Sequence, residues 1–100
     1  MRDSFWVYMV ECRDASYYFG ITNDADRRVA EHNLGVDTHC YTYTRRPVHL
    51  VYAAEFRDPN EAIRFEKQIK GWSRKKKQAL IRGDWGEIVR ISREYRPRRG

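Results

Sequence analysis

The chain has 100 residues, with 20 Lys and Arg, 14 Asp and Glu, and a formal net charge of +6. That length fits one domain, which we expect over residues 1–95, followed by a basic tail at residues 96–100. The composition, 41% hydrophobic and 14% aromatic, excludes a disordered chain. No apolar run approaches the roughly 20 residues of a membrane span, so we expect no membrane partner. Two cysteines without metal-site spacing fit a reducing cytoplasm, where we place the protein.

The positive charge is concentrated in the second half of the sequence. Residues 1–50 carry six basic and seven acidic side chains, whereas residues 51–100 carry 14 basic and seven acidic ones. The densest basic run is residues 74–77. Such a run suits a polyanion, because lysine and arginine release condensed counterions when they neutralise phosphates. A solvated helix face that keeps the protein soluble is the alternative reading.

The sequence begins with a predicted hairpin. Residues 5–12 are rich in aromatic and β-branched side chains and predict a strand covered on both faces. Residues 13–16 predict a turn, and residues 17–21 a second strand. Gly20 lies inside that strand, and a position without a side chain there indicates the close approach of another group.

A helix, a loop and a third strand follow. Residues 22–24 supply capping oxygens for a helix that runs to about Leu34, and Gly35 is a natural stop. Residues 36–47 predict a loop, and residues 48–56 a strand. Three more helices are expected, at about residues 59–70, 74–81 and 85–95. This order predicts an α+β domain, in which helices flank a small three-stranded antiparallel sheet.

The spacing of four polar side chains in the first half of the sequence indicates that they can lie close together. Tyr8 and Tyr18 stand on the two strands of the hairpin, although a single tyrosine there is more typical of a core edge. Arg28 and His32 are four positions apart on the first helix and therefore share one face. Because the helix directly follows the second strand, this face can look toward Tyr18. Alone, such a pair is more often simply solvated.

Glu66 completes the set. Ala62, Phe65 and Ile69 form an apolar stripe that should face the sheet, and Glu66 lies on the rim of that stripe. A partly desolvated carboxylate requires a cation or a hydrogen-bond donor. An ion pair with a nearby Arg or Lys is one solution, and a bound Mg²⁺ or Mn²⁺ is the other.

Together these side chains can hydrolyse a phosphodiester. A hard metal on Glu66 would neutralise charge on the phosphate or the leaving oxygen. Arg28 would hold the phosphoryl oxygens through its fork of donors. Tyr8 or His32 would orient or deprotonate the attacking water. A free phenol has a pKa near ~10, so a tyrosine base requires a neighbouring cation.

The ordered series resembles the GIY-YIG nuclease superfamily, in its small single-domain bacterial type. The resemblance covers about residues 5–81, with Trp6 where the family name has glycine. Its motifs are Trp6-Val7-Tyr8, Tyr18-Phe19-Gly20, Arg28 with His32 one turn on, and Glu66 within EAIRFEKQIKGWSRKKKQAL.

The resemblance implies a role for each of these residues. Tyr8 and Tyr18 would position or activate water, and Arg28 would stabilise the phosphate. His32 would assist, and Glu66 would hold one divalent metal, Mg²⁺ or Mn²⁺. The family nicks or cuts DNA, with some members in excision repair and branched-DNA resolution. We therefore expect a metal-dependent DNA endonuclease without a small-molecule cofactor, non-specific or selective for branched or single-stranded DNA.

The basic residues then gain a role as contacts to the phosphate backbone, which position a protein without reading sequence. A catalytically weak nucleic-acid-binding module with the same fold is the main alternative function. A protein whose basic face meets an acidic partner is a third. The residues expected to contact the DNA phosphate backbone are Arg45, Arg46, Lys70, Arg74, Lys75, Lys76 and Lys77.

Overall fold

A computed structural model describes residues 4–94 of the chain. Residues 4–70 and 71–94 belong to two separate compact units. The basic tail expected at residues 96–100 lies outside the described part, and the expectation of one domain over residues 1–95 remains a prediction. No helix within the described part is long and apolar enough to cross a membrane.

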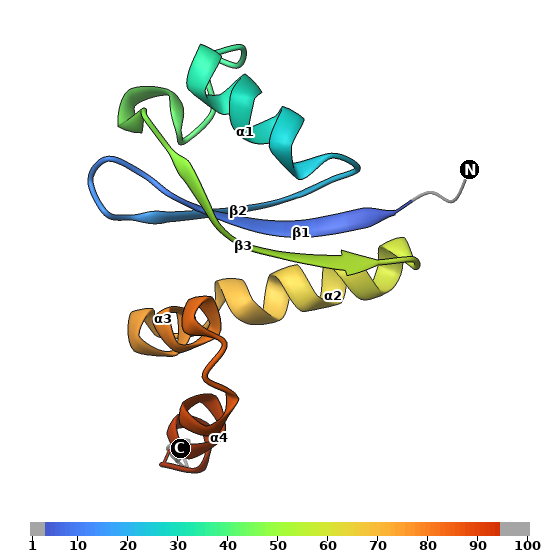
Figure 1. The fold of residues 1–100 in the computed structure, drawn as a ribbon, viewed down its shortest axis with the longest axis vertical. Coiled ribbons are helices and arrows are strands. Elements are labelled where there is room, and N and C mark those ends of the chain that lie inside the picture. Colours follow the sequence, from blue (N-terminus) through green and yellow to red (C-terminus); the bar gives the residue numbers. More distant parts are fainter. Residues whose placement is uncertain (1–3, 95–100) are drawn as a thin grey trace, which may run out of the picture. The chain divides into compact units, whose positions relative to one another are not determined.

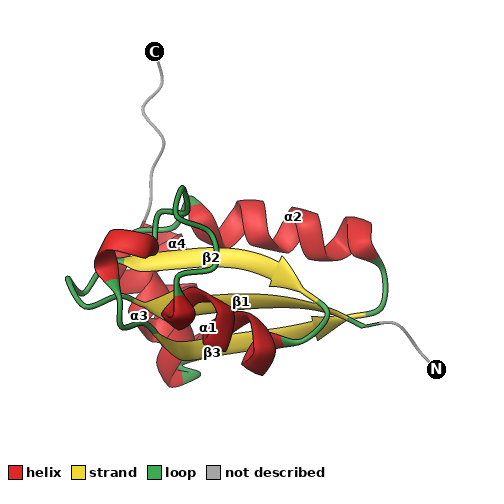
Figure 2. Ribbon diagram, turned by 90° about the horizontal axis from the view of Figure 1, so that it is seen from above, coloured by secondary structure: helices red, strands yellow, loops and turns green. Residues whose placement is uncertain are grey.

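The first unit is built on a three-stranded antiparallel sheet, as predicted (Figure 2). The strands are β1 (Phe5–Glu11), β2 (Tyr17–Thr22) and β3 (His49–Phe56). Their order is β2-β1-β3, so the first strand of the chain is the central one. Helices cover both faces of this sheet, which explains why β1 is apolar at both odd and even positions.

Two helices cover the two faces of the sheet (Figure 1). Helix α1 (Ala25–Leu34) lies on one face, where Val29 packs against the buried cluster of Tyr8, Val10, Cys12 and Val48. Helix α2 (Pro59–Lys70) lies on the other face. Because side chains alternate along a strand, β1 serves both cores at once.

Helix α2 buries the stripe that its sequence predicts. Ala62 and Ile69 are fully buried. The ring of Phe65 packs near two aromatic rings of β3, with centroid distances of 6.4 Å to Tyr52 and 5.3 Å to Phe56. This packing fixes the rotation of α2 and leaves Glu66 on the rim of the buried stripe.

The ends of α1 follow from the predicted signals. The Asp24 carboxylate accepts a hydrogen bond from the Arg27 N–H at 3.0 Å. At the other end Gly35 has a φ of 72°, a left-handed conformation that glycine adopts without steric cost. The segment that follows, predicted as a loop, contains one short 3₁₀ helix, η1 (Tyr43–Arg45).

The second unit contains the pair α3 (Arg74–Arg82) and α4 (Trp85–Glu94), which pack against each other. The Ser73 hydroxyl caps α3 by accepting from the Lys76 N–H at 3.2 Å. Gly83, with a φ of 71°, separates the two helices.

Gly20 lies where the hairpin meets the ring of Tyr8. The two residues are paired across β1 and β2, so their side-chain positions share one face. A Cβ at residue 20 would lie 2.6 Å from Cζ and 2.7 Å from Cε1 of the Tyr8 ring. The missing side chain of Gly20 therefore provides the space that the phenol occupies, as the sequence indicates.

We expect Gly20→Ala to lower the free energy of unfolding by about 1–3 kcal/mol, because the fully buried Tyr8 cannot move aside without strain. Gly86→Ala is the matched control: its Cβ would meet only Asp84 Oδ1, at 3.7 Å. That substitution on α4 should be neutral or stabilising by up to about 1 kcal/mol. Chemical denaturation followed by circular dichroism measures both, and equal stability of Gly20→Ala and wild type would contradict this packing argument.

Candidate active site

The candidate site is centred on the buried phenol of Tyr8. Tyr8 and Tyr18 lie on the same face of the hairpin, because Tyr8 pairs with Gly20 and Val10 pairs with Tyr18. Helix α1 places His32 beside both phenols. The ring centroid of His32 lies 5.9 Å from that of Tyr8 and 5.3 Å from that of Tyr18. The predicted convergence of α1 on the hairpin tyrosines is therefore present.

A chain of hydrogen bonds runs through His32. Its Nε2 lies 2.8 Å from the Tyr8 hydroxyl, and its Nδ1 lies 2.8 Å from Thr42 Oγ1. The Thr42 hydroxyl donates its proton to Cys40 Sγ at 3.4 Å. On this direction we assign the Nδ1–H tautomer to His32, because a hydroxyl has one proton and Thr42 can then only accept from Nδ1–H. The Nε2 atom is left as the acceptor for the Tyr8 O–H.

Thr42 and Cys40 are the members of this site that the sequence did not reveal. Thr42 is one of three threonines in the segment 36–47, and nothing in the sequence distinguishes it from Thr38 or Thr44. In the structure it is 1% exposed, and its hydroxyl lies on the imidazole. Cys40 is half-buried, 3.9 Å from His32 Nδ1. Only the path of the loop over α1 selects these two residues.

Burial keeps both phenols protonated. It raises the pKa of Tyr8, although the nearby guanidinium of Arg28 acts in the opposite direction. Burial, together with Cys40, raises the pKa of Tyr18 to about 12. A cation next to Tyr8 is present, as a tyrosine base requires, but in the free protein burial outweighs it.

The imidazole of His32 is held neutral. Burial lowers its pKa, and the charge of Arg28 lowers it further. A neutral imidazole protonated at Nδ1 has a free lone pair at Nε2, which is the atom that meets Tyr8. In this pair the protonated phenol of Tyr8 therefore faces the unprotonated Nε2 of His32.

Arg28 lies at the edge of this pair, with its side chain 29% exposed. Its Nη1 lies 3.2 Å from Glu31 Oε1, an ion pair within α1. A guanidinium has five N–H donors, so this contact leaves others for an incoming anion. The predicted face of α1 is therefore neither fully solvated nor fully paired.

Glu66 influences the site electrostatically. Its carboxylate contributes to the raised pKa of Tyr8, after burial and Cys40. The side chain is 18% exposed, and Lys70 Nζ lies 3.9 Å from Oε1, at the outer limit of an ion pair. Within residues 4–94 this is the polar contact that the structure gives Glu66, so its oxygens retain lone pairs for a cation.

The donor set around Glu66 suits a hard metal ion with few protein ligands. No group of three or more His, Cys, Asp or Glu that could hold a metal exists among residues 4–94. Magnesium commonly binds through one or two carboxylates, keeping several waters and contacting substrate phosphates. One partly exposed carboxylate fits that mode and does not fit a closed zinc site.

The two arginines of the loop are engaged in holding it. Arg45 Nη1 donates to the carbonyl of Tyr41 at 2.8 Å, and its guanidinium lies 3.7 Å from the Tyr41 ring centroid. Arg46 Nε donates to the carbonyl of Tyr43 at 2.8 Å. Both guanidinium groups therefore have a structural task, and their predicted contact with a phosphate backbone stays a prediction.

The other residues predicted to contact the DNA phosphate backbone belong to both units of the chain. Lys70, 59% exposed, ends α2 in the first unit. The run from Arg74 to Lys77 forms the first turn of α3 in the second unit. Lys75 is 69% exposed and lies 4.0 Å from Glu87, whereas burial lowers the pKa of Lys77.

This combination of fold and site defines a GIY-YIG catalytic domain, and residues 4–79 match the family of that description. The chain is 45% identical over 80 residues to a UPF0213 protein of Staphylococcus aureus strain Mu3, covering 80% of this chain and 96% of that one. The chain therefore belongs to the GIY-YIG family, among its small bacterial UPF0213 proteins.

Two solved structures share the fold. The solution NMR structure of the UPF0213 protein BH0048 from Bacillus halodurans is 35% identical, with a TM-score of 0.53 over 94% of this chain and 99% of that chain. The solution NMR structure of protein EF2693 from E. faecalis is 27% identical, with a TM-score of 0.54 over both whole chains. The predicted fold class is confirmed by these similarities.

We expect Thr42→Val to release the imidazole of His32 from its single protonation pattern, because valine cannot accept from Nδ1–H. Nitrogen-15 NMR of the His32 ring should show a proton on Nδ1 in the wild type and in Thr42→Ser, and a mixture of both forms in Thr42→Val. Unfolding should become easier by about 1–3 kcal/mol, the cost of losing a buried hydrogen bond. Thr44→Val, at an exposed position, is the control. A wild-type ring protonated on Nε2 would contradict the assignment.

The stability of the protein should depend on His32 below about pH 6.5. Because the folded pKa of His32 is lowered, the unfolded chain binds a proton that the folded chain does not. The stabilisation is complete above the unfolded pKa and is lost as the pH falls through the folded one. We expect the free energy of unfolding, measured by denaturation, to fall less steeply from about pH 7 to pH 5 in His32→Gln than in the wild type. His39→Gln, at an exposed position, should follow the wild type. Identical pH dependence of all three proteins would refute the buried neutral imidazole.

Proposed function

We propose that the protein is a metal-dependent DNA endonuclease that hydrolyses phosphodiester bonds. The observation that carries the proposal is the environment of the Tyr8 phenol. Its hydroxyl lies 2.8 Å from the neutral His32, and both the Arg28 guanidinium and the Glu66 carboxylate act on its pKa. A proton-transfer pair flanked by one cation and one carboxylate that can hold a metal suits phosphodiester hydrolysis.

The direction of the hydrogen bond defines what the pair does. The Tyr8 proton points at His32 Nε2, so the phenol oxygen has lone pairs for a proton from water. As the hydroxide attacks phosphorus, the water proton passes to Tyr8, and the proton of Tyr8 passes to His32 Nε2. The imidazolium that forms still donates through Nδ1 to Thr42. Tyr18 lies against the same imidazole and helps to exclude water from it.

The two charged groups take the remaining tasks. Arg28 presents its free N–H donors to the phosphoryl oxygens, where negative charge builds up. A Mg²⁺ or Mn²⁺ ion, when held by Glu66, supplies positive charge to the phosphate and to the leaving oxygen. Both roles are consistent with the partial exposure of the two side chains.

The substrate is DNA, bound mainly through its backbone. Phosphate contacts from exposed lysines and arginines do not read sequence, so we propose a non-specific or structure-selective enzyme that acts in DNA repair or processing. The net charge of +6 supports a polyanionic substrate.

A nicking assay tests this function. Supercoiled plasmid and branched and single-stranded oligonucleotides are incubated with Mg²⁺, Mn²⁺ or EDTA. We expect metal-dependent cleavage that falls at least about 100-fold in Arg28→Ala and Glu66→Gln, because each removes charge stabilisation from the transition state. Arg27→Ala and Glu61→Gln are matched controls, since these residues lie on the same helices with exposed side chains.

The result separates the candidate functions. Cleavage by the wild type and both controls, but not by Arg28→Ala or Glu66→Gln, would support the enzyme. DNA binding without cleavage under any metal would favour the binding module. Cleavage that survives Glu66→Gln would overturn the assignment of the metal ligand.

A further inference from the structure

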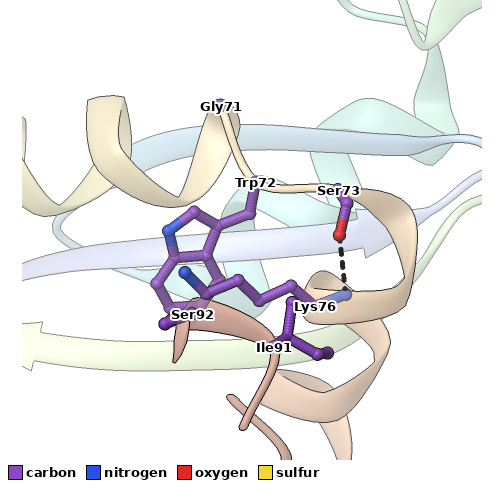
Figure 3. A pocket seen from close by; sticks show the side chains of 6 residues that line it. All are labelled: Gly71, Trp72, Ser73, Lys76, Ile91 and Ser92. Atoms are coloured by element: carbon purple, nitrogen blue, oxygen red, sulfur yellow. Dashed lines mark hydrogen bonds between the residues drawn. The ribbon is translucent and has the colours of Figure 1, made fainter. Parts of the chain in front are cut away.

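A pocket of about 500 Å³ lies within the second unit (Figure 3). It opens beside the start of α3, and α4 forms its other wall. None of the residues assigned above to catalysis takes part in it. The lining residues are Gly71, Trp72, Ser73, Lys76, Ile91 and Ser92.

The pocket combines a flat aromatic surface with a cation. The indole of Trp72 is half-buried, and Lys76 Nζ lies 4.2 Å from its ring centroid. In Figure 3 the Lys76 side chain runs alongside the indole, with the ammonium group over the ring. Such a contact is weak at an exposed site, and a lysine stem is flexible. The ammonium group can therefore leave the ring for a stronger partner.

The sequence segment that contains the pocket favours an anionic ligand by its charge. Residues 71–100 carry ten basic and three acidic side chains, whereas residues 1–70 carry ten basic and eleven acidic ones. The whole excess of positive charge thus belongs to the segment that contains the pocket. Lys75, 69% exposed on the first turn of α3, adds a second cation next to Lys76.

We propose that this pocket binds one unpaired nucleobase of the DNA, stacked on Trp72, with the neighbouring phosphates on Lys75 and Lys76. An aromatic platform next to cations is the way in which proteins hold single strands without reading their sequence. A base inside a duplex cannot reach such a surface, so the site favours DNA with single-stranded character. This inference rests on the proposed function, because it specifies the form of the DNA that the nuclease binds.

Equilibrium binding tests the site without interference from cleavage. All proteins carry Glu66→Gln, and the probes are a fluorescent oligothymidylate and a duplex of the same length. We expect Trp72→Ala to weaken single-strand binding about tenfold, the size of one lost stacking contact, and to leave duplex binding unchanged. Trp72→Phe, which keeps an aromatic face, should retain most of the affinity.

Two further variants serve as comparisons. Trp85→Ala removes a tryptophan that is 55% exposed and does not line the pocket, and it should bind both probes like the parent protein. Lys76→Gln should reduce the slope of log affinity against log salt by about one, because one phosphate contact is lost. Circular dichroism of Trp72→Phe and Trp72→Ala confirms that the helices are intact.

Each outcome decides the inference. It is overturned if Trp72→Ala binds the single strand as tightly as the parent, or if Trp72→Ala and Trp72→Phe weaken single-strand and duplex binding equally. Displacement of the oligothymidylate by polyglutamate at equal charge would also overturn it, in favour of an acidic protein partner. If single-strand binding depends on Trp72 but the protein never cleaves DNA, the binding site is supported and the proposed nuclease is refuted. If the protein nicks DNA but its single-strand binding does not depend on Trp72, the nuclease is supported and the binding site is refuted.

Discussion

The first unit depends on one buried phenol. The ring of Tyr8 fills the space that Gly20 leaves open, which places its hydroxyl inside the protein. A buried hydroxyl without a partner is costly, and His32 provides the partner at 2.8 Å. The imidazole is buried in turn and requires Thr42 on its other nitrogen. The hairpin, α1 and the loop before β3 are therefore held in place by one continuous hydrogen-bonded chain.

The same burial determines which forms of these groups exist at neutral pH. It raises the pKa of Tyr8 and lowers that of His32, so both groups are neutral before any proton moves. Charge is restricted to the rim, where Arg28 and Glu66 remain partly exposed. A site that is buried and neutral inside and charged at its edge is suited to an anionic substrate.

The candidate active-site residues and the excess of basic residues lie in different parts of the chain. Residues 4–70 contain every side chain of the candidate active site, and their segment has almost no net charge. The second unit has the excess of lysine and arginine and an aromatic pocket of its own. This division leaves the candidate active site buried and close to neutral, and it places the excess of basic side chains on another segment, as the proposed binding of a polyanion would require.

The secondary-structure elements and the order of the site residues could be derived from the amino-acid sequence alone. Caps such as Asp24 and Gly35 act locally, so the bounds of the helices follow from neighbouring residues, and the apolar side chains at both odd and even positions of β1 indicate burial on both faces. The sequence also indicated a close approach at Gly20 and the rim position of Glu66. The folded structure was needed to show that Thr42 and Cys40 complete the hydrogen-bonded chain, and that burial outweighs Arg28 in its effect on the pKa of Tyr8. These facts depend on the path of a loop and on the degree of desolvation, which arise from contacts between residues far apart in the chain.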